Sequence, residues 1–418
     1  MICISMLRIY WLPGHAGSAS LVAISGLTIR RTLLVISAIA SALAGSAVAA
    51  GSVLEWRALS ESPNDHTCQA VPFEQPQGLA IDHDGNIYVG NEGGAKALQK
   101  ISTGGVITTL LDRGPKKPDG LAYGKLSLAL RPNGRIVLGV GARGTIEELE
   151  QVAGAVPKVL AGQPGKFGLT DGPASQATFK TIRAVAMGPH GDVYIADSRT
   201  IRKLSADGVV STLAGDEHAK KDYADGKSGA AAFGEPRGLA IDDLGNVYVA
   251  DGSWRIGEEG HGSSFGLLRK IDPLGVVTSI AGDMDADGAQ LDGRGTGASF
   301  TELFGMAGRP DHALYVTEAA YINRFAIRRI SAALDVTTIL DAGDLADFEK
   351  DRDGSDPAFY RSTGIAIDPN GTVYLTDAGG NKLHRIEKQL QEMQQNPQRH
   401  SDEYVTTLCS IANSSTRD

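Results

Sequence analysis

The chain has 418 residues, of which 42% are hydrophobic and 6% aromatic, and it contains 52 glycines. This balance permits a large core built from small side chains and tight turns, which favours an all-β protein. The formal net charge is −9 and no basic block occurs, which argues against nucleic acid as a partner, because its phosphates demand clusters of Lys and Arg. The acidic balance favours cations over anions as partners.

Residues 1–49 have the pattern of a signal peptide. They contain Arg8, Arg30 and Arg31 but no acidic residue, and the apolar run TLLVISAIASALAG leads to the small residues of 47–49, AVA. A basic start, a short apolar stretch and an A-x-A site are typical of a cleaved export signal, and the stretch is shorter than a membrane span needs. We therefore expect a periplasmic or secreted protein without a transmembrane segment in its mature chain.

Six copies of one segment recur along the chain. The three clearest are PQGLAIDHDGNIYVGN (76–91), PRGLAIDDLGNVYVAD (236–251) and RSTGIAIDPNGTVYLTD (361–377). The three weaker ones are LSLALRPNGRIVLGV (126–140), RAVAMGPHGDVYIAD (183–197) and FGMAGRPDHALYVTE (304–318). Their predicted turns lie at Gly85, Gly134, Gly191, Gly245, His312 and Gly371. The turns are separated by roughly fifty to seventy residues, which is typical of a repeat architecture.

Most copies continue into a basic and apolar strand and then a Thr-rich one, as in IRKLSADGVVSTLAG (201–215). Each copy therefore predicts four strands joined by tight turns. In a propeller each sheet lies between two neighbours, so its inner strands should be apolar, with small residues where the blades converge. The segment GLAID fits this rule. We predict that 50–418 form one all-β domain, a six-bladed β-propeller of four-stranded antiparallel sheets.

The pattern GLAIDxxGNxYVAD, followed by IRKL and VVSTLAG, resembles the NHL repeat over nearly all of 50–418. The resemblance implies a binding platform, although related six-bladed propellers include lactonases, lyases and hydrolases. The chain is more distantly similar to the gluconolactonase and regucalcin family. That family carries a metal-binding Glu in an E-G-P-x-W context, whereas this chain has EQPQGLAID, with Glu74 only loosely placed.

Two further features concern the scaffold. Three Asp-Gly pairs, at Asp171, Asp225 and Asp292, are each followed eight residues later by a phenylalanine, and we interpret these phenylalanines as wedges between blades.

Cys68 and Cys409 remain near the two ends of the mature chain. We predict a disulfide at the junction of the sixth and first blades, worth about 3 to 5 kcal/mol in the chain-entropy model, with two free thiols as the alternative. Either 53–60 or 404–410 supplies the outer strand that closes the ring.

Two rings of residues are candidate ligand sites on the rim that carries the long loops. The first ring, at the ends of the second strands, is Asn91, Val140, Asp197, Asp251, Glu318 and Asp377. Its carboxylates either bind a cation at the channel mouth or serve as acid and base, or they accept backbone N–H bonds in their own turns. The second ring, before the inner strands, is Gln77, Leu126, Arg183, Arg237, Phe304 and Thr363. Arg183 and Arg237 either hold a carboxylate or sugar acid, or pair with Asp197 and Asp251.

One insert has the spacing of a calcium loop. Within 282–295, oxygen ligands stand at alternate positions before a glycine: Asp283, Asp285, Asp287 and Gly288. This resembles the first half of an EF-hand loop, but the twelfth position is Arg294, so a bidentate ligand would come from elsewhere, with Asp292 as the candidate. Two interpretations stay open: a site for Ca²⁺ or another divalent metal, or an ordinary acidic loop.

No G-x-S-x-G, H-E-x-x-H or phosphate-binding glycine loop occurs in the chain, so covalent catalysis has no visible candidate. We therefore expect a monomeric binding or scaffolding module rather than an enzyme, which recognises a protein, peptide or glycan through the long-loop rim. The alternative is a divalent-metal-dependent lactonase or hydrolase.

Export makes a direct prediction. Because the A-x-A site ends at Ala49, the exported protein should begin near Ala50. N-terminal sequencing of secreted or periplasmic material checks this, and a mature chain that still contains Arg30 and Arg31 would contradict it.

Overall fold

The computed structural model describes residues 73–112, 123–221, 223–256, 262–286, 289–320, 324–341, 364–379, 381–386 and 405–409, with only the backbone described at 253–256, 262–264, 319–320, 324 and 405–409. All of these residues belong to one compact unit of the chain. None of the described helices has the length and apolar character that crossing a bilayer requires. The predicted signal peptide and Cys68 lie outside the described residues.

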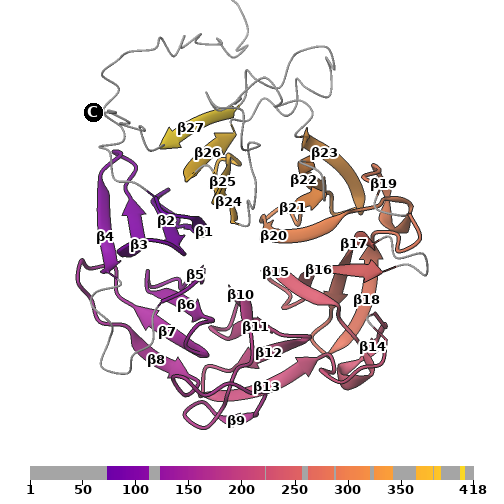
Figure 1. Ribbon diagram of the computed structural model, residues 1–418, viewed down its shortest axis with the longest axis horizontal. Coiled ribbons are helices and arrows are strands. Elements are labelled where there is room, and N and C mark those ends of the chain that lie inside the picture. Colours follow the sequence, from indigo (N-terminus) through magenta and orange to yellow (C-terminus); the bar gives the residue numbers. More distant parts are fainter. Residues whose placement is uncertain are drawn as a thin grey trace, which may run out of the picture. The chain divides into compact units, whose positions relative to one another are not determined.

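The described residues form six antiparallel sheets, one for each copy of the repeat (Figure 1). Sheets one and two are β1 (Pro76–Ile81), β2 (Ile87–Asn91), β3 (Lys96–Ile101) and β4 (Ile107–Asp112), then β5 (Leu126–Leu130), β6 (Ile136–Val140), β7 (Thr145–Leu149) and β8 (Lys158–Ala161). Sheets three and four contain β10 (Ile182–Met187), β11 (Val193–Asp197), β12 (Thr200–Leu204) and β13 (Val209–Ala214), then β15 (Glu235–Ile241), β16 (Val247–Ile256), β17 (Gly262–Ile271) and β18 (Val276–Ala281). Sheets five and six contain β20 (Glu302–Gly308), β21 (Leu314–Ala320), β22 (Arg324–Ile330) and β23 (Asp335–Asp341), then β24 (Ile365–Ile367), β25 (Val373–Asp377), β26 (Lys382–Ile386) and β27 (Val405–Cys409).

Three sheets carry a short fifth strand that the sequence did not predict. These strands are β9 (Gly172–Pro173), β14 (Gly226–Lys227) and β19 (Gly293–Arg294), and the last two lead into the 3₁₀ turns η1 (Ser228–Ala230) and η2 (Gly295–Gly297). Each one pairs with the fourth strand of the sheet that its connection is about to enter. The connection between blades therefore covers part of the outer edge of the next blade, which protects that edge from pairing with another chain.

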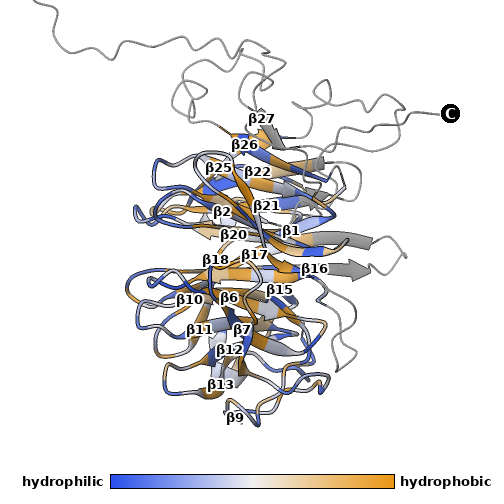
Figure 2. Ribbon diagram, turned by 90° about the vertical axis from the view of Figure 1, so that its left-hand side faces the viewer, coloured by the Kyte–Doolittle hydropathy of each residue, from blue (hydrophilic) through white to orange (hydrophobic). Residues whose placement is uncertain are grey.

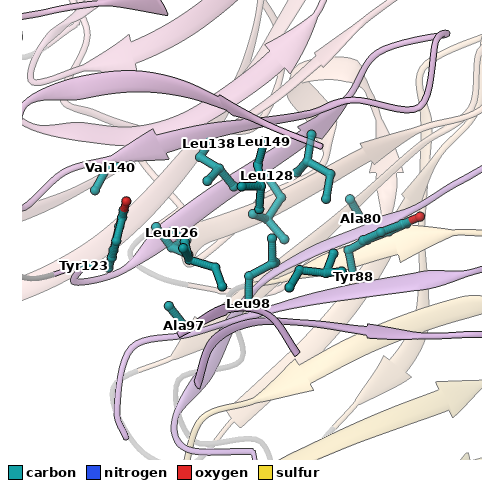
Figure 3. Packing of buried hydrophobic residues seen from close by; sticks show 13 residues of the cluster. Ala80, Tyr88, Ala97, Leu98, Tyr123, Leu126, Leu128, Leu138, Val140 and Leu149 are labelled. Carbon is teal, nitrogen blue, oxygen red and sulfur yellow. The ribbon is translucent and has the colours of Figure 1, made fainter. Parts of the chain in front are cut away.

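The six sheets close into a ring. The inner strands β1, β5, β10, β15, β20 and β24 contact one another in this order, and β24 contacts β1 again. Six apolar clusters lie between successive blades, including one between the sixth blade and the first. Figure 3 shows the cluster between blades one and two, where Leu98 lies beside Leu126 and Leu128. The predicted six-bladed propeller is confirmed.

The repeat consensus has a local physical cause. In the first blade, Asp82 accepts hydrogen bonds from the backbone and side-chain nitrogens of Asn86, both at 2.8 Å, and from the Tyr88 hydroxyl at 2.8 Å. The fourth blade repeats this arrangement. The spacing D-x-x-G-N-x-Y therefore specifies a turn that is capped by its own aspartate. All six predicted turn residues have a positive φ: Gly85, Gly134, Gly191, Gly245, His312 and Gly371.

Three glycines in or directly before an inner strand are required by the closeness of the neighbouring blade. A Cβ atom at Gly78 would lie 2.3 Å from the carbonyl oxygen of Leu126, and one at Gly364 would lie 2.3 Å from that of Gln77. At Gly238 the corresponding distance to the Phe304 carbonyl oxygen is 2.7 Å. These contacts confirm the expectation of small residues where the blades converge, because no larger residue fits against a rigid backbone.

The sixth sheet is completed by the C-terminal strand. β27 pairs with β26, with Val405 opposite Ile386 and Cys409 opposite Leu383. Of the two predicted closing segments, the structure therefore places the C-terminal one in the sheet, while 53–60 lie outside the described residues. The Cys68–Cys409 disulfide stays a prediction for the same reason.

The contacts of the glycines predict a difference between two alanine substitutions. Gly238→Ala should destabilise the protein by about 1–3 kcal/mol, because the new methyl group forces two inner strands apart. Gly297→Ala is the matched control, since a Cβ there meets no atom within 4 Å. Thermal unfolding followed by circular dichroism measures both variants, and equal melting temperatures would refute this account of the inner strands.

Candidate functional site

Both predicted rings lie on the same rim of the propeller, which we call the long-loop rim. The inner strands begin there and the second strands end there, as the pairs Pro76 with Asn91 and Pro236 with Asp251 show. The connections between blades and those between second and third strands also arrive on this rim. In the fourth blade the pairing of β16 with β17 continues past Asp251 as far as Ile256. Figure 2 views the described sheets from the side.

The residues of the first ring point into the interior of their blades. All six are at most 1% exposed. In five blades the side chain contacts a polar residue on the third strand of the same sheet. These pairs are Asn91 with Gln99, Asp197 with Arg202, Asp251 with Arg269, Glu318 with Arg328, and Asp377 with His384. The structure therefore buries these carboxylates instead of presenting them at the channel mouth.

In three blades this pair belongs to a larger arrangement, which we call the arginine latch. In the fourth blade the Arg269 guanidinium donates to Asp251 at 3.2 Å and to Asp225 of the preceding connection at 2.8 Å. It also donates to the carbonyl oxygens of Ala224 and Ala232 and lies 5.2 Å from the ring centroid of Phe233. The latches of the third and fifth blades are formed by Arg202 with Asp171, Asp197 and Phe179, and by Arg328 with Asp292, Glu318 and Phe300.

The latch explains why an Asp-Gly pair precedes a phenylalanine by eight residues. Asp225 also accepts hydrogen bonds from the backbone and hydroxyl of Ser279 on the fourth strand, both at 3.0 Å. It thereby joins the connection to the outer edge of the blade, while Phe233 fills the core between two blades. The buried arginines were not singled out from the sequence, although an arginine between apolar residues in IRKL, LRKI and IRRI is their signal.

Carboxylates of the first ring also accept hydrogen bonds from backbone nitrogens. Asp197 accepts from the backbone nitrogens of Lys180 and Thr181, and Glu318 accepts from that of Thr301. Burial raises the pKa of Asp251 to about 7, although Arg269 and backbone N–H groups oppose the shift. These contacts fit the interpretation that the carboxylates of the first ring accept backbone N–H bonds in their own turns. Binding of a ligand by Asn91, Asp197, Asp251, Glu318 and Asp377 stays a prediction.

A cavity of about 90 Å³ lies on the axis, within the long-loop end of the channel. Every blade contributes to its wall from the first half of its inner strand. The polar lining residues are Gln77, Lys125, Ser127, Arg183 and Arg237. Deeper in the channel, the lining consists of Leu79, Leu128, Val185, Leu239, Met306 and Ile365. The cavity therefore has a cationic mouth above an apolar floor.

Backbone bulges place three of the polar side chains at this mouth. The pairing of β1, β10 and β15 with their neighbouring strands skips one residue near the start of each strand. The skipped residues are Gln77, Arg183 and Arg237. A bulge leaves the extra residue unpaired and re-aims its side chain, so these three line the channel although their neighbours pack between blades. Thr363, the sixth-blade member of the predicted ring, lies outside the described residues.

The second blade differs and supplies a cation that the sequence did not reveal. β5 pairs with β6 without a bulge, and Leu126 is fully buried in the cluster between blades one and two (Figure 3). The preceding residue, Lys125, is exposed and takes the place at the cavity mouth. Because this bulge is missing, the residue that lines the cavity stands one position earlier in the second copy of the repeat than in the others. The degenerate sequence of this copy gave no sign of the shift.

The two arginines at the mouth are held by Glu235 of the fourth blade and Glu302 of the fifth blade. Arg237 contacts Glu302 at 2.6 Å and Glu235, and its guanidinium lies 4.7 Å from the Phe304 ring centroid. Arg183 lies 4.0 Å from Glu235 and donates to the carbonyl oxygen of Ser198 at 2.7 Å. The alternative prediction that these arginines pair with Asp197 and Asp251 is wrong, because the latch arginines occupy those carboxylates.

The predicted calcium loop is only partly described. Asp283 accepts a hydrogen bond from the backbone nitrogen of Asp285 at 2.9 Å, and Asp287 lies outside the described residues. Asp292 instead accepts from Arg328 and Thr338, each at 2.8 Å. No group of three or more His, Cys, Asp or Glu side chains that could hold a metal occurs within the part of the chain that the structure describes. Metal binding at this loop stays a prediction, and Asp292 has a different role in the structure.

Comparison with known proteins gives distant similarities. No family model matches the chain. Teneurin-3 of Danio rerio is 25% identical in an alignment of 344 residues that covers 74% of this chain but 12% of teneurin-3. A virginiamycin B lyase of Staphylococcus aureus has a TM-score of 0.45 at 14% identity, over 81% of this chain and 85% of the lyase. An auxiliary nutrient binding protein of Bacteroides thetaiotaomicron has a TM-score of 0.41 at 16% identity, over 58% of this chain and 56% of that one. At these values the similarities carry no argument about function.

The latch predicts a strong effect of removing one arginine. Arg269→Met should cost about 3–5 kcal/mol of stability, because it leaves Asp251 buried without its partner. Arg294→Met is the control, since that side chain is 75% exposed and its nearest carboxylate, on Asp335, lies 3.9 Å away. Urea unfolding measures both variants, and a loss below about 1 kcal/mol for Arg269→Met would show that the latch is dispensable.

Proposed function

We propose that the chain is an exported propeller of the NHL-repeat type that binds a protein, peptide or glycan through its long-loop rim. The observation that supports this best is the cationic mouth of the axial cavity, where Lys125, Arg183 and Arg237 of three successive blades line one space. Binding sites favour concave surfaces with a few convergent polar groups. The repeat pattern and the distant similarity to teneurin-3 support the NHL-type assignment.

The surroundings of the mouth suit recognition. Arg183 and Arg237 are 26% and 22% exposed, and their positions are held by Glu235 and Glu302 before any ligand arrives. A site that is already ordered loses less side-chain entropy on binding.

The proposed function predicts which surface a ligand occupies. Ligands are first selected by screening the exported chain against peptide and glycan arrays. Arg183→Gln and Arg237→Gln should each weaken binding of these ligands by about 10-fold, because each change removes a charged hydrogen-bond donor. Arg135→Gln on the opposite rim is the control, since its side chain pairs with Glu148 and Glu150 away from the cavity. Biolayer interferometry with the exported chain gives the affinities.

Two results would overturn the proposal. One is a loss of binding in Arg135→Gln alone, which would place the ligand on the opposite rim. The other is turnover of a lactone together with one tightly bound divalent ion per chain, which would make the metal-dependent lactonase the correct function. Metal analysis and lactone hydrolysis assays of the same preparation detect the second result.

A further inference from the structure

We propose that the cavity mouth takes the C-terminal carboxylate of a peptide whose last side chain is small and apolar, with Lys125 as the main charged contact. This inference rests on the proposed binding function and names the chemical group that enters the cavity. It comes from the charge balance at the mouth, the shape of the cavity and the chemistry of its floor.

The three cations that line the mouth differ in whether they form direct ion pairs. Arg237 contacts two glutamates, and Arg183 shares one of them. Lys125 forms no ion pair with any described residue, and Glu92, the carboxylate whose charge acts on it, accepts a hydrogen bond from Gln77. A singly charged carboxylate would give Lys125 the direct ion pair that it lacks. A dianion such as phosphate would need more free positive charge than the site offers.

The electrostatic environment of Lys125 supports the same conclusion. Water reaches the Lys125 side chain, but the surrounding channel wall lowers the pKa of its ammonium group by desolvation. Glu92 opposes this shift, and the nearby guanidinium groups reinforce it. The pKa of Arg183 is lowered by burial as well. Positive charges are therefore crowded in this space, and an anion placed among them relieves the repulsion.

The shape of the cavity favours the end of a chain. The described inner strands surround it from all sides, and its lining extends no deeper than the apolar floor. Because the lining comes only from the first half of each inner strand, the end of a chain fits the cavity better than a polymer that continues through it. A terminus that approaches along the axis meets Lys125 first and the floor afterwards.

The floor favours a peptide over a sugar acid. Leu79, Leu128 and Val185 present only hydrocarbon to the space below the cations. A uronic acid carries hydroxyl groups around its ring, and burying them against hydrocarbon without partners costs free energy. An alanine or valine side chain at a peptide C-terminus gains free energy from the same contact.

The test uses the exported full chain and two fluorescein-labelled hexapeptides that both end in Ala-Val. One peptide has a free C-terminal carboxylate and the other a C-terminal amide. We expect the free acid to bind about 10-fold or more tightly than the amide in fluorescence anisotropy, because the amide lacks the charge that Lys125 recognises. Lys125→Gln should abolish the difference between the two peptides, whereas Lys158→Gln, which removes an exposed lysine of β8, should preserve it. Circular dichroism confirms that both variants fold.

Three results would overturn the inference. They are equal affinities for acid and amide, an unchanged preference in Lys125→Gln, and displacement of the label by glucuronate or inorganic phosphate at lower concentrations than by propionate. Any of these results would reject the carboxylate site. If binding of the array ligands is still weakened by Arg183→Gln and Arg237→Gln, the proposed binding function remains supported. Failure of both experiments would reject the function itself.

Discussion

Every blade of this protein has two apolar faces, and this constraint determines the rest of the architecture. A single sheet of this kind can bury its faces only between two others, and a row of sheets would leave the first and last exposed. The ring removes both ends, and the sixth cluster, in which Leu79 and Val89 pack near Leu383, is the contact that closes it. Ring closure brings six inner strands together on one axis, and the inner-strand glycines are the local consequence.

The ring also decides where charge lies. The chain is acidic overall, and its carboxylates at the ends of the second strands suggest an anionic channel mouth. The structure turns these carboxylates into the blades, where they bind arginines of the third strands and order the connections between blades. The charged side chains that line the mouth are Lys125, Arg183 and Arg237, which are all basic although the whole chain is acidic. For this reason net charge was a poor guide to the site.

Bulges in three inner strands place polar side chains at the candidate site. Without a bulge the first residues of an inner strand would alternate between the two faces of the sheet and would be buried between blades, as Leu126 is. The bulges at Gln77, Arg183 and Arg237 free one residue per blade from this alternation and direct it to the axis. These three polar side chains thereby line the cavity instead of packing between blades.

The sequence by itself determined the features that are local and repeated. The turn glycines, the four strands of each copy and the number of blades follow from short motifs such as G-L-A-I-D and D-x-x-G-N-x-Y, whose hydrogen bonds lie within six residues. Arg183 and Arg237 could be singled out as candidates, because they interrupt an apolar pattern. Only the tertiary structure decided that Lys125 replaces Leu126 at the mouth, that Asp225 and Asp251 share Arg269, and that the C-terminal strand joins the sixth sheet. These facts depend on strand register and on contacts between residues far apart in the chain, and one residue of register reverses the face to which a side chain points.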